Sequence, residues 1–176
     1  MQFGAVWAAD CAYYLADFGR KVGREVTADD VEILTWALAE MGNVVTGGQL
    51  LDAISEAMRA NRKAAKWWAP APEGGGFDLL LTPTLGEPPV LHGTFDSTPE
   101  EPLGGFFRSA SFVPFPAQFN VSGQPAINLP LHWNDDGLPI GVQLVGAFGR
   151  EDVLLRVAAQ VEAAQPWADR RPPVFA

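Results

Sequence analysis

The sequence has little positive charge, little histidine and almost no cysteine. Lysine and arginine together number 12 against 21 acidic residues, which gives a formal net charge of -9 at pH 7. Such an acidic chain repels phosphate backbones and anionic lipid headgroups, so neither nucleic acid nor a membrane surface is an expected partner. The single cysteine, Cys11, allows no internal disulfide bond and gives no sign of secretion.

We also expect neither a membrane-spanning segment nor a signal peptide. The first stretch, MQFGAVWAADCAYYLADFG, is apolar, but Asp10 and Asp17 interrupt it and no basic region or cleavage site accompanies it. Hydrophobic residues make up 48% of the chain and charged residues 19%, which is typical of a globular protein rather than a disordered one. We therefore expect a soluble, cytoplasmic protein.

The familiar catalytic and cofactor motifs are absent. Ser122-Gly123 lacks the preceding glycine of a nucleophile elbow, and there is neither a phosphate-binding loop nor a dinucleotide fingerprint. His92 and His132, without clustered cysteines or carboxylates, make a poor metal site. Cys11, on an apolar helix, is expected to be a small core residue rather than a nucleophile. The residues therefore predict no metal, no organic cofactor and no catalytic group.

A serine–histidine–aspartate triad is an alternative that the residue types leave open. It would use Ser122, His132 and either Asp135 or Asp136. However, His132 is expected near a hairpin tip, and triad members close together along one hairpin do not easily converge. No oxyanion-stabilising group is evident beside Ser122. An independent small hydrolase built on these residues is kept as a rival hypothesis.

What the sequence does contain begins with helices over residues 1–72. Apolar residues recur there at helical spacing. Thr27 and Asp30 resemble a capping box at the start of TADDVEILTWALAEMG, which is expected to be one helix. Thr46 is expected to begin a third helix, which a pair of prolines ends.

Residues 77–118 are expected to form one strand and a long proline-rich loop. The run FDLLLTPT is short, continuous and apolar, as in a strand that is buried on both faces. From Thr82 to Gln118 there is no periodicity, and seven prolines occur. The aromatic residues of this stretch argue against disorder, so we expect an ordered loop that packs over another part of the molecule.

Residues 119–176 predict a hairpin, a helix and a tail. AINLPLHW and LPIGVQLVG are strand-like, and Asp136-Gly137 between them is a strong turn signal. Pro130 inside the first strand indicates an edge strand or a bulge. REDVLLRVAAQVEAA is an amphipathic helix that Pro166 ends. The chain, 1–176, is therefore expected to be one α/β unit, with helices packed on a few-stranded mixed sheet.

Three stretches taken together resemble the C-terminal third of the amidase signature family. They are FDLLLTPTLGEPP, FNVSGQPAINLPL and GLPIGVQLVGAFGREDVLLRVAAQVE, within about Phe77 to Trp167. The branch that they resemble is that of the 6-aminohexanoate cyclic dimer hydrolases and related bacterial amidases. The resemblance implies a partial amidase-signature fold, small amide substrates, and no metal or organic cofactor.

The resemblance also implies where the chemistry lies. In the family, a Gly/Ser-rich segment supplies a serine nucleophile and a second serine on an unusual cis peptide, and a lysine is the base of an acyl-enzyme mechanism. Nothing in this chain resembles that segment, and Lys21, Lys63 and Lys66 do not match the base. No catalytic residue is therefore carried over, and the chain alone is expected to be inactive.

Pro83, Thr84 and Asn120 are the substrate-binding candidates that the resemblance implies. The Pro83-Thr84 turn follows a strand whose C-terminal end faces the substrate cleft in the family, and the loop that begins at Asn120 lies near the pocket. Clefts form at the carboxyl ends of parallel strands, which makes this placement reasonable. A purely structural role, with glycine and proline shaping a turn, is the alternative.

The expected sheet also implies a partner. A sheet of about three strands has open edges and an uncovered apolar face. We expect these to be covered by further copies of the chain, as a homo-oligomer, or by the N-terminal part of the family fold that is missing here. A non-catalytic subunit derived from a split or degenerate amidase is the alternative function.

Overall fold

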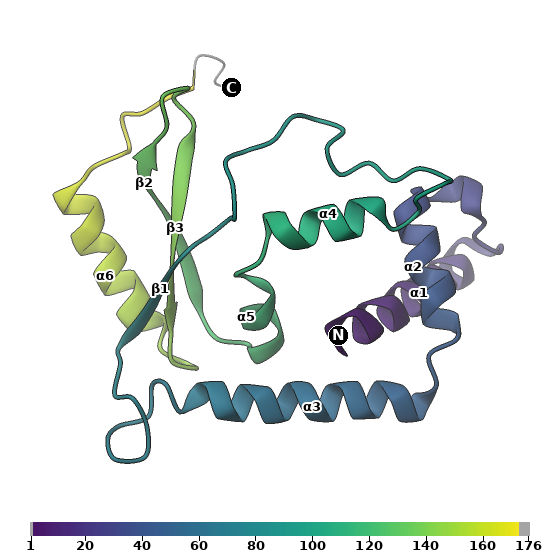
Figure 1. Ribbon diagram of the computed structural model, residues 1–176, viewed down its shortest axis with the longest axis horizontal. Helices are drawn as coiled ribbons and strands as arrows, with labels where there is room; N and C mark the ends of the chain where they lie inside the picture. The colour runs from purple at the N-terminus through teal and green to yellow at the C-terminus, as the bar shows by residue number, and fades with distance from the viewer. Residues whose placement is uncertain (1, 173–176) are drawn as a thin grey trace. The chain divides into compact units, whose positions relative to one another are not determined.

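A computed structural model describes residues 2–172, with side chains described from Gly4 onward. The chain divides into two compact units (Figure 1). One unit runs up to Arg62 and includes Val90–Phe112, and the other comprises Lys63–Pro89 and the chain from Val113 onward. None of the helices within residues 2–172 has the length and apolarity needed to cross a bilayer.

The first unit is helical. Its elements are α1 (Gln2–Val22), the 3₁₀ turn η1 (Ala28–Asp30), α2 (Ile33–Asn43), most of α3 (Gly47–Ala65) and α4 (Gly104–Phe112). Helices α1 and α2 approach each other so closely that a β-carbon added at Gly42 would collide with the carbonyl of Ala8. Both residues are buried, so the helical core of this unit depends on small residues at the contact.

The predicted capping residues lie at helix starts, but one of them caps a shorter element than expected. The carboxylate of Asp30 accepts a hydrogen bond of 2.9 Å from the backbone N–H of Thr27 and completes the capping box. This capping box lies at the start of η1 and not at the start of α2. Since the next two residues are extended, α2 begins later, at Ile33, and the prediction of one continuous helix was wrong. Thr46 does begin α3, where its hydroxyl accepts a bond of 3.2 Å from the N–H of Gln49.

The second unit is built on a three-stranded sheet, which confirms the α/β class. Its elements are β1 (Leu79–Pro83), α5 (Ala117–Ser122), β2 (Ala126–Trp133), β3 (Pro139–Gly146) and α6 (Glu151–Ala164). The strand order is β1-β3-β2, with β3 antiparallel to both neighbours. A few-stranded sheet is therefore confirmed, but its described pairings are antiparallel rather than mixed.

Both features predicted for the hairpin are confirmed. In the turn between β2 and β3, Gly137 has a φ of 76°, and the side-chain carbonyl of Asn134 accepts a bond of 2.8 Å from the N–H of Leu138. Pro130 lies in an edge strand, and the register of β2 shifts between Pro130 and His132. Proline has no N–H to donate, so an edge position with a bulge is where it disturbs the ladder least.

Helix α6 covers one face of the sheet. The buried core cluster consists of Leu129, Leu144, Leu154 and Ala158. Leu154 and Ala158 lie four residues apart on α6 and meet the leucines of β2 and β3, as the amphipathic pattern predicted. This apolar layer is the main buried contact of the second unit.

Residues 77–118 are more regular than predicted. The expected strand is present as β1, which is an outer strand of the sheet. Its Leu81 is 65% exposed, so β1 is not buried on both faces as predicted. The prediction of one long loop was wrong in part, because α4 occupies Gly104–Phe112 and α5 begins at Ala117. Asn120 therefore lies within a helix.

Candidate functional site

Helix α6 covers one face of the sheet (Figure 1), and the strand register places a row of polar side chains on the other face. Directly paired residues share a face and successive residues alternate. The register therefore places Thr82, Asn128 and Gln143 together on the face away from the core leucines. Thr84 continues the row beyond β1, where its N–H donates to the carbonyl of Gly141 at 3.2 Å.

Thr84 and Asn128 are joined across the middle strand. The hydroxyl of Thr84 donates a hydrogen bond to the side-chain carbonyl oxygen of Asn128. Gly141 lies between them: a β-carbon there would collide with the Asn128 amide and come within 3.0 Å of the Thr84 hydroxyl oxygen. Asn128 is exposed, and no hydrogen bond within residues 2–172 uses its amide nitrogen. Its two N–H donors are thus oriented and available to a carbonyl or carboxylate.

Gln143 and Thr82 form a second polar pair in the same row. Gln143 is only 6% exposed, and its amide nitrogen donates a hydrogen bond of 3.1 Å to the Thr82 hydroxyl. A buried amide donor without a partner costs about 1–3 kcal/mol. The pair therefore satisfies a buried group while tying β1 to β3.

The substrate-binding candidates Pro83, Thr84 and Asn120 are not brought together. Thr84 belongs to the polar row, whereas Pro83 is exposed on the alternate position of β1. Asn120 is exposed on α5, its N–H donates to the carbonyl of Pro116 at 3.3 Å, and no hydrogen bond of the described residues joins it to Thr84. The parallel-strand argument was wrong for the described pairings, because β1 is antiparallel to β3. Substrate binding by these three residues stays a prediction.

Sequence reasoning missed Asn128, Gly141 and Gln143. A signal was present, because Gln143 is the single polar side chain of β3, and Asn128 lies among apolar residues in β2, which has one other polar residue, His132. Gly141 precedes Gln143 by two residues and so shares its face. That these residues meet Thr82 and Thr84 depends on the register of β3 with both neighbours, which no local pattern specifies.

The residues of the rival triad make other contacts. The hydroxyl of Ser122 donates a hydrogen bond of 3.1 Å to the side-chain carbonyl of Gln124. His132, Asp135 and Asp136 are exposed, in β2 and the following turn. Within the described residues no hydrogen bond links Ser122 to His132, so no base is in position to activate this serine.

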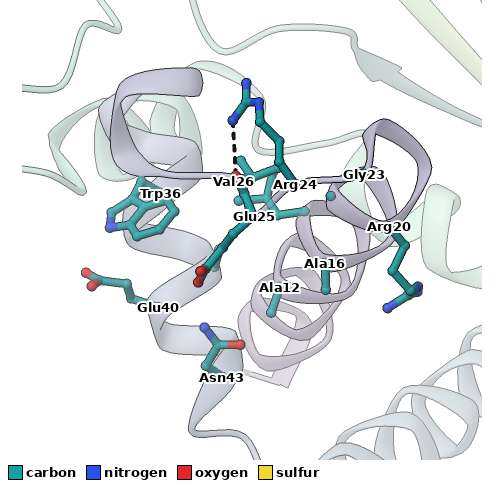
Figure 2. A pocket seen from close by; sticks show the side chains of 13 residues that line it. Ala12, Ala16, Arg20, Gly23, Arg24, Glu25, Val26, Trp36, Glu40 and Asn43 are labelled. Carbon is teal, nitrogen blue, oxygen red and sulfur yellow. Dashed lines mark hydrogen bonds between the residues drawn. The ribbon is translucent and has the colours of Figure 1, made fainter.

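The first unit contains a separate hollow of about 520 Å³, shown in Figure 2. It is bounded by α1, the turn that follows it and α2. Its charged lining includes Arg20, Arg24, Glu25 and Glu40, and Trp36 supplies an aromatic wall. The hollow therefore has the size of a small-molecule pocket, and its charges decide what it could accept.

The arginines at this hollow are already neutralised. Arg24 donates two hydrogen bonds of 2.7 Å to the carboxylate of Asp30, which hold the pKa of that carboxyl well below its usual range. It also donates to the carbonyl of Glu25 at 3.0 Å (Figure 2). Arg20 pairs with Asp17 at 3.1 Å. An anionic ligand would have to displace these carboxylates, so the polar row of the sheet is the better candidate site.

The single thiol is not activated. Cys11 is partly buried in α1, and burial, followed by the nearby charge of Asp10, raises the pKa of its thiol. A raised pKa keeps the group protonated near neutral pH, whereas the thiolate is the nucleophilic form. Cys11 is only partly buried and is not among the buried core residues of the described chain, so the prediction of a core position is not confirmed.

Comparison with known proteins gives a consistent result. The Amidase family model matches residues 8–155. The 6-aminohexanoate-cyclic-dimer hydrolases of Pseudomonas sp. (strain NK87) and Paenarthrobacter ureafaciens are each 41% identical over 162 residues, which cover 88% of this chain and 31% of the relative. Putative amidase AmiA2 of Mycobacterium tuberculosis (strain ATCC 25618 / H37Rv) is 32% identical over 167 residues, 92% of this chain and 31% of the relative. The chain thus spans about a third of these curated relatives.

Solved structures show the same relationship. A structure of 6-aminohexanoate cyclic dimer hydrolase matches 94% of this chain and 34% of its own chain, with a TM-score of 0.84 and 39% identity. A structure of that enzyme complexed with substrate matches 98% of this chain and 37% of its own, with a TM-score of 0.86 and 36% identity. A bacterial aryl acylamidase of the amidase signature family has a TM-score of 0.71 at 21% identity, which supports the fold alone.

Proposed function

This chain belongs to the amidase signature family, and we propose that it is the part of an amidase that completes the fold and forms a wall of the substrate site. The observation that carries the proposal is the family match over residues 8–155, together with 41% identity over 162 residues to two cyclic-dimer hydrolases. The reaction is hydrolysis of an amide carbon–nitrogen bond. A serine attacks the carbonyl, the amine leaves, and water releases the acid from the acyl-enzyme.

We propose that the serine nucleophile, the second serine and the lysine base lie in the part of the family fold that this chain does not span. An acyl-transfer serine needs a base within hydrogen-bond reach. In the described part of the chain, no serine is hydrogen-bonded to a lysine or a histidine. By itself the chain is therefore proposed to be inactive toward amides.

The proposed substrates are small amides built from linear aliphatic amino acids. The relatives at 41% identity are named for the 6-aminohexanoate cyclic dimer, and the same class of substrate is proposed for an enzyme that contains this chain. In the polar row, the exposed amide of Asn128 is suited to donate to a substrate carbonyl, with its orientation held by Thr84. Pro83, on the other face of β1, and Asn120, on α5, are kept as proposed substrate-binding residues outside this row.

The test compares amine release from the 6-aminohexanoate cyclic dimer in three samples. They contain this chain, the unmatched remainder of the Paenarthrobacter ureafaciens relative, and the two combined. Turnover is expected only in the combined sample. Turnover by this chain alone would contradict the proposal, as would a complex of the two parts that hydrolyses neither this dimer nor other small amides.

A second candidate, a non-catalytic interaction subunit, is favoured by one surface feature of the first unit. Tyr13, Tyr14 and Phe18 of α1 are each more than half exposed, and the two tyrosine rings lie 5.4 Å apart. Exposed aromatic groups of this kind mark interaction surfaces. In this case the chain would form a homo-oligomer, which light scattering would detect and a Tyr14→Ser substitution would weaken.

A cytoplasmic location of the protein stays a prediction from the sequence.

A further inference from the structure

The hollow of the first unit has an apolar lining with one aromatic wall. Ala12 and Ala16 of α1 line it together with Val26 of the following turn, and Trp36 of α2 supplies the aromatic ring. Val26 is buried, and Trp36 is partly exposed toward the hollow. Hydrocarbon groups gain free energy when they leave water for surroundings of this kind. The hollow is therefore suited to the apolar part of a small molecule.

The two arginines at the hollow oppose a cation only weakly. Arg20 is paired with Asp17 at 3.1 Å, and Arg24 with Asp30 at 2.7 Å. Figure 2 shows the guanidinium group of Arg24 and the carboxylate of Glu25 directed to opposite sides of the turn that follows α1. Opposite charges at such short distances largely cancel, so the arginines leave little net positive charge on the ligand side.

The two glutamates of the lining are uncommitted. Glu25 and Glu40 are exposed, and within residues 2–172 no hydrogen bond or ion pair uses either carboxylate. The bond from Arg24 reaches the backbone carbonyl of Glu25 and leaves its side chain free. Ionised carboxylates accept charge-assisted hydrogen bonds from ammonium groups. The face of a tryptophan ring also attracts a cation, so Trp36 adds to the same preference.

We propose that this hollow binds an aliphatic amine in its ammonium form. The ammonium group pairs with Glu25 and Glu40, and the hydrocarbon chain lies against Trp36 and the alanines of α1. A hard metal ion fits less well, because it takes about six or more oxygen ligands, whereas this lining offers two carboxylates beside an apolar wall. The formal net charge of -9 also favours the approach of a cation.

This site goes beyond the proposed function. It lies wholly within the first unit, whereas the polar row of Thr82, Thr84, Asn128 and Gln143 belongs to the second. The two sites share no residue, so substitutions in the hollow leave the polar row intact. Binding of an amine can therefore be measured on this chain alone, independently of amide hydrolysis.

The test is an NMR titration of this chain with hexylamine, which is protonated at pH 7. Hexanoate and hexanol serve as probes of the same length with negative and zero charge. We expect saturable shifts of the Trp36 indole N–H and of amides around the hollow, with a Kd of about 1–10 mM for so small a ligand. Hexanol is expected to bind more weakly, and hexanoate is expected not to saturate.

Two variants and a matched control locate the ammonium group. Glu25→Gln and Glu40→Gln should each raise the Kd for hexylamine about threefold, the usual size of a partly exposed charge pair. Glu32→Gln is the control, because Glu32 is an exposed residue just before α2 that does not line the hollow, and it should bind like the wild type. Thermal unfolding confirms that each variant is folded.

Three results would overturn the proposal of an amine site. The first is hexanol or hexanoate binding as tightly as hexylamine, which would remove the role of charge. The second is wild-type affinity in both Glu25→Gln and Glu40→Gln. The third is a set of shifts that lies outside the hollow and leaves the Trp36 indole unchanged.

Discussion

The hydroxyl of Thr84 is hydrogen-bonded to the side-chain carbonyl of Asn128, although the two residues lie on opposite sides of the middle strand. The contact is possible because residue 141, between them, is glycine. It links the end of β1 to β2, which is not its neighbour in the sheet. This bond thus links the two outer strands across the polar face and holds the exposed amide donors of Asn128 in place.

Gly141→Ala is expected to break this bond. The new β-carbon would collide with the Asn128 amide, and because that side chain is exposed it can swing away at modest cost. We expect a loss of about 1 kcal/mol in the free energy of unfolding, the usual net worth of one hydrogen bond. Urea unfolding measures the loss, and the NMR signals of the Asn128 amide should move toward those of an unrestrained side chain.

Gly4→Ala is the control for this substitution. Gly4 lies in α1, and a β-carbon there would meet nothing within 4 Å. Alanine in a helix interior is expected to be neutral or slightly stabilising. If Gly141→Ala proves equally harmless and leaves the Asn128 signals unchanged, the account of the polar row is wrong.

A double-mutant cycle of Thr84→Val and Asn128→Ala tests the bond directly. The two side chains touch, so their effects on the free energy of unfolding should not add. We expect a coupling energy of about 0.5–1.5 kcal/mol, since residues in contact couple and distant ones do not. A coupling energy near zero would mean that the bond contributes nothing in solution.

The Thr82→Val substitution is expected to destabilise the protein by more than the partial exposure of Thr82 suggests. The buried amide nitrogen of Gln143 would lose its partner, at a cost of about 1–3 kcal/mol. Adding Gln143→Leu removes the unsatisfied amide, so the double variant should recover part of the stability. Equal stability of the single and double variants in urea unfolding would count against this explanation.

The Arg24–Asp30 pair predicts a dependence of stability on pH in the first unit. Hydrogen bonds from Arg24 lower the pKa of Asp30 in the folded state, so the unfolded chain binds this proton more readily. The stabilisation is complete above the unfolded pKa of about 3.9 and is lost as the pH falls through the lower folded pKa. Asp30→Asn should therefore destabilise the protein at pH 7 and have a smaller effect at pH 2.

Unfolding experiments at the two pH values check this prediction, with Asp29→Asn as the control. Asp29 is adjacent and exposed, and it makes no side-chain hydrogen bond in the described part of the chain. An Asp30→Asn effect that is the same at pH 7 and pH 2 would show that the ion pair is not its source.

The sequence predicted those parts of the fold that depend on local chemistry. The turn at Gly137, the edge position of Pro130 and the inward face of α6 all follow from turn geometry, missing donors or helical spacing. The two helices after β1 were missed, because paired glycines open α4 and α5 is only six residues long. In such short segments, tertiary packing outweighs intrinsic propensity.

The candidate site was predicted only in part, for a related reason. Thr84 was implied by the resemblance to the amidase family, in which the strand before it ends at the substrate cleft, and it does belong to the polar row. Its partners Asn128 and Gly141 come from the hairpin and meet it only through the register of β3 with both outer strands. Sequence periodicity indicates which residues share a face of a strand, but it does not specify which strands are neighbours.

The central claim, that catalysis belongs to a part of the amidase fold outside this chain, is tested most directly by labelling with a serine-reactive fluorophosphonate. The probe is added to the complex of this chain with the remainder of its relative, and mass spectrometry locates the adduct. We predict an adduct on the remainder alone, and the same turnover when Ser122→Ala replaces the wild-type chain. An adduct on Ser122, with turnover lost in the Ser122→Ala variant, would contradict the account.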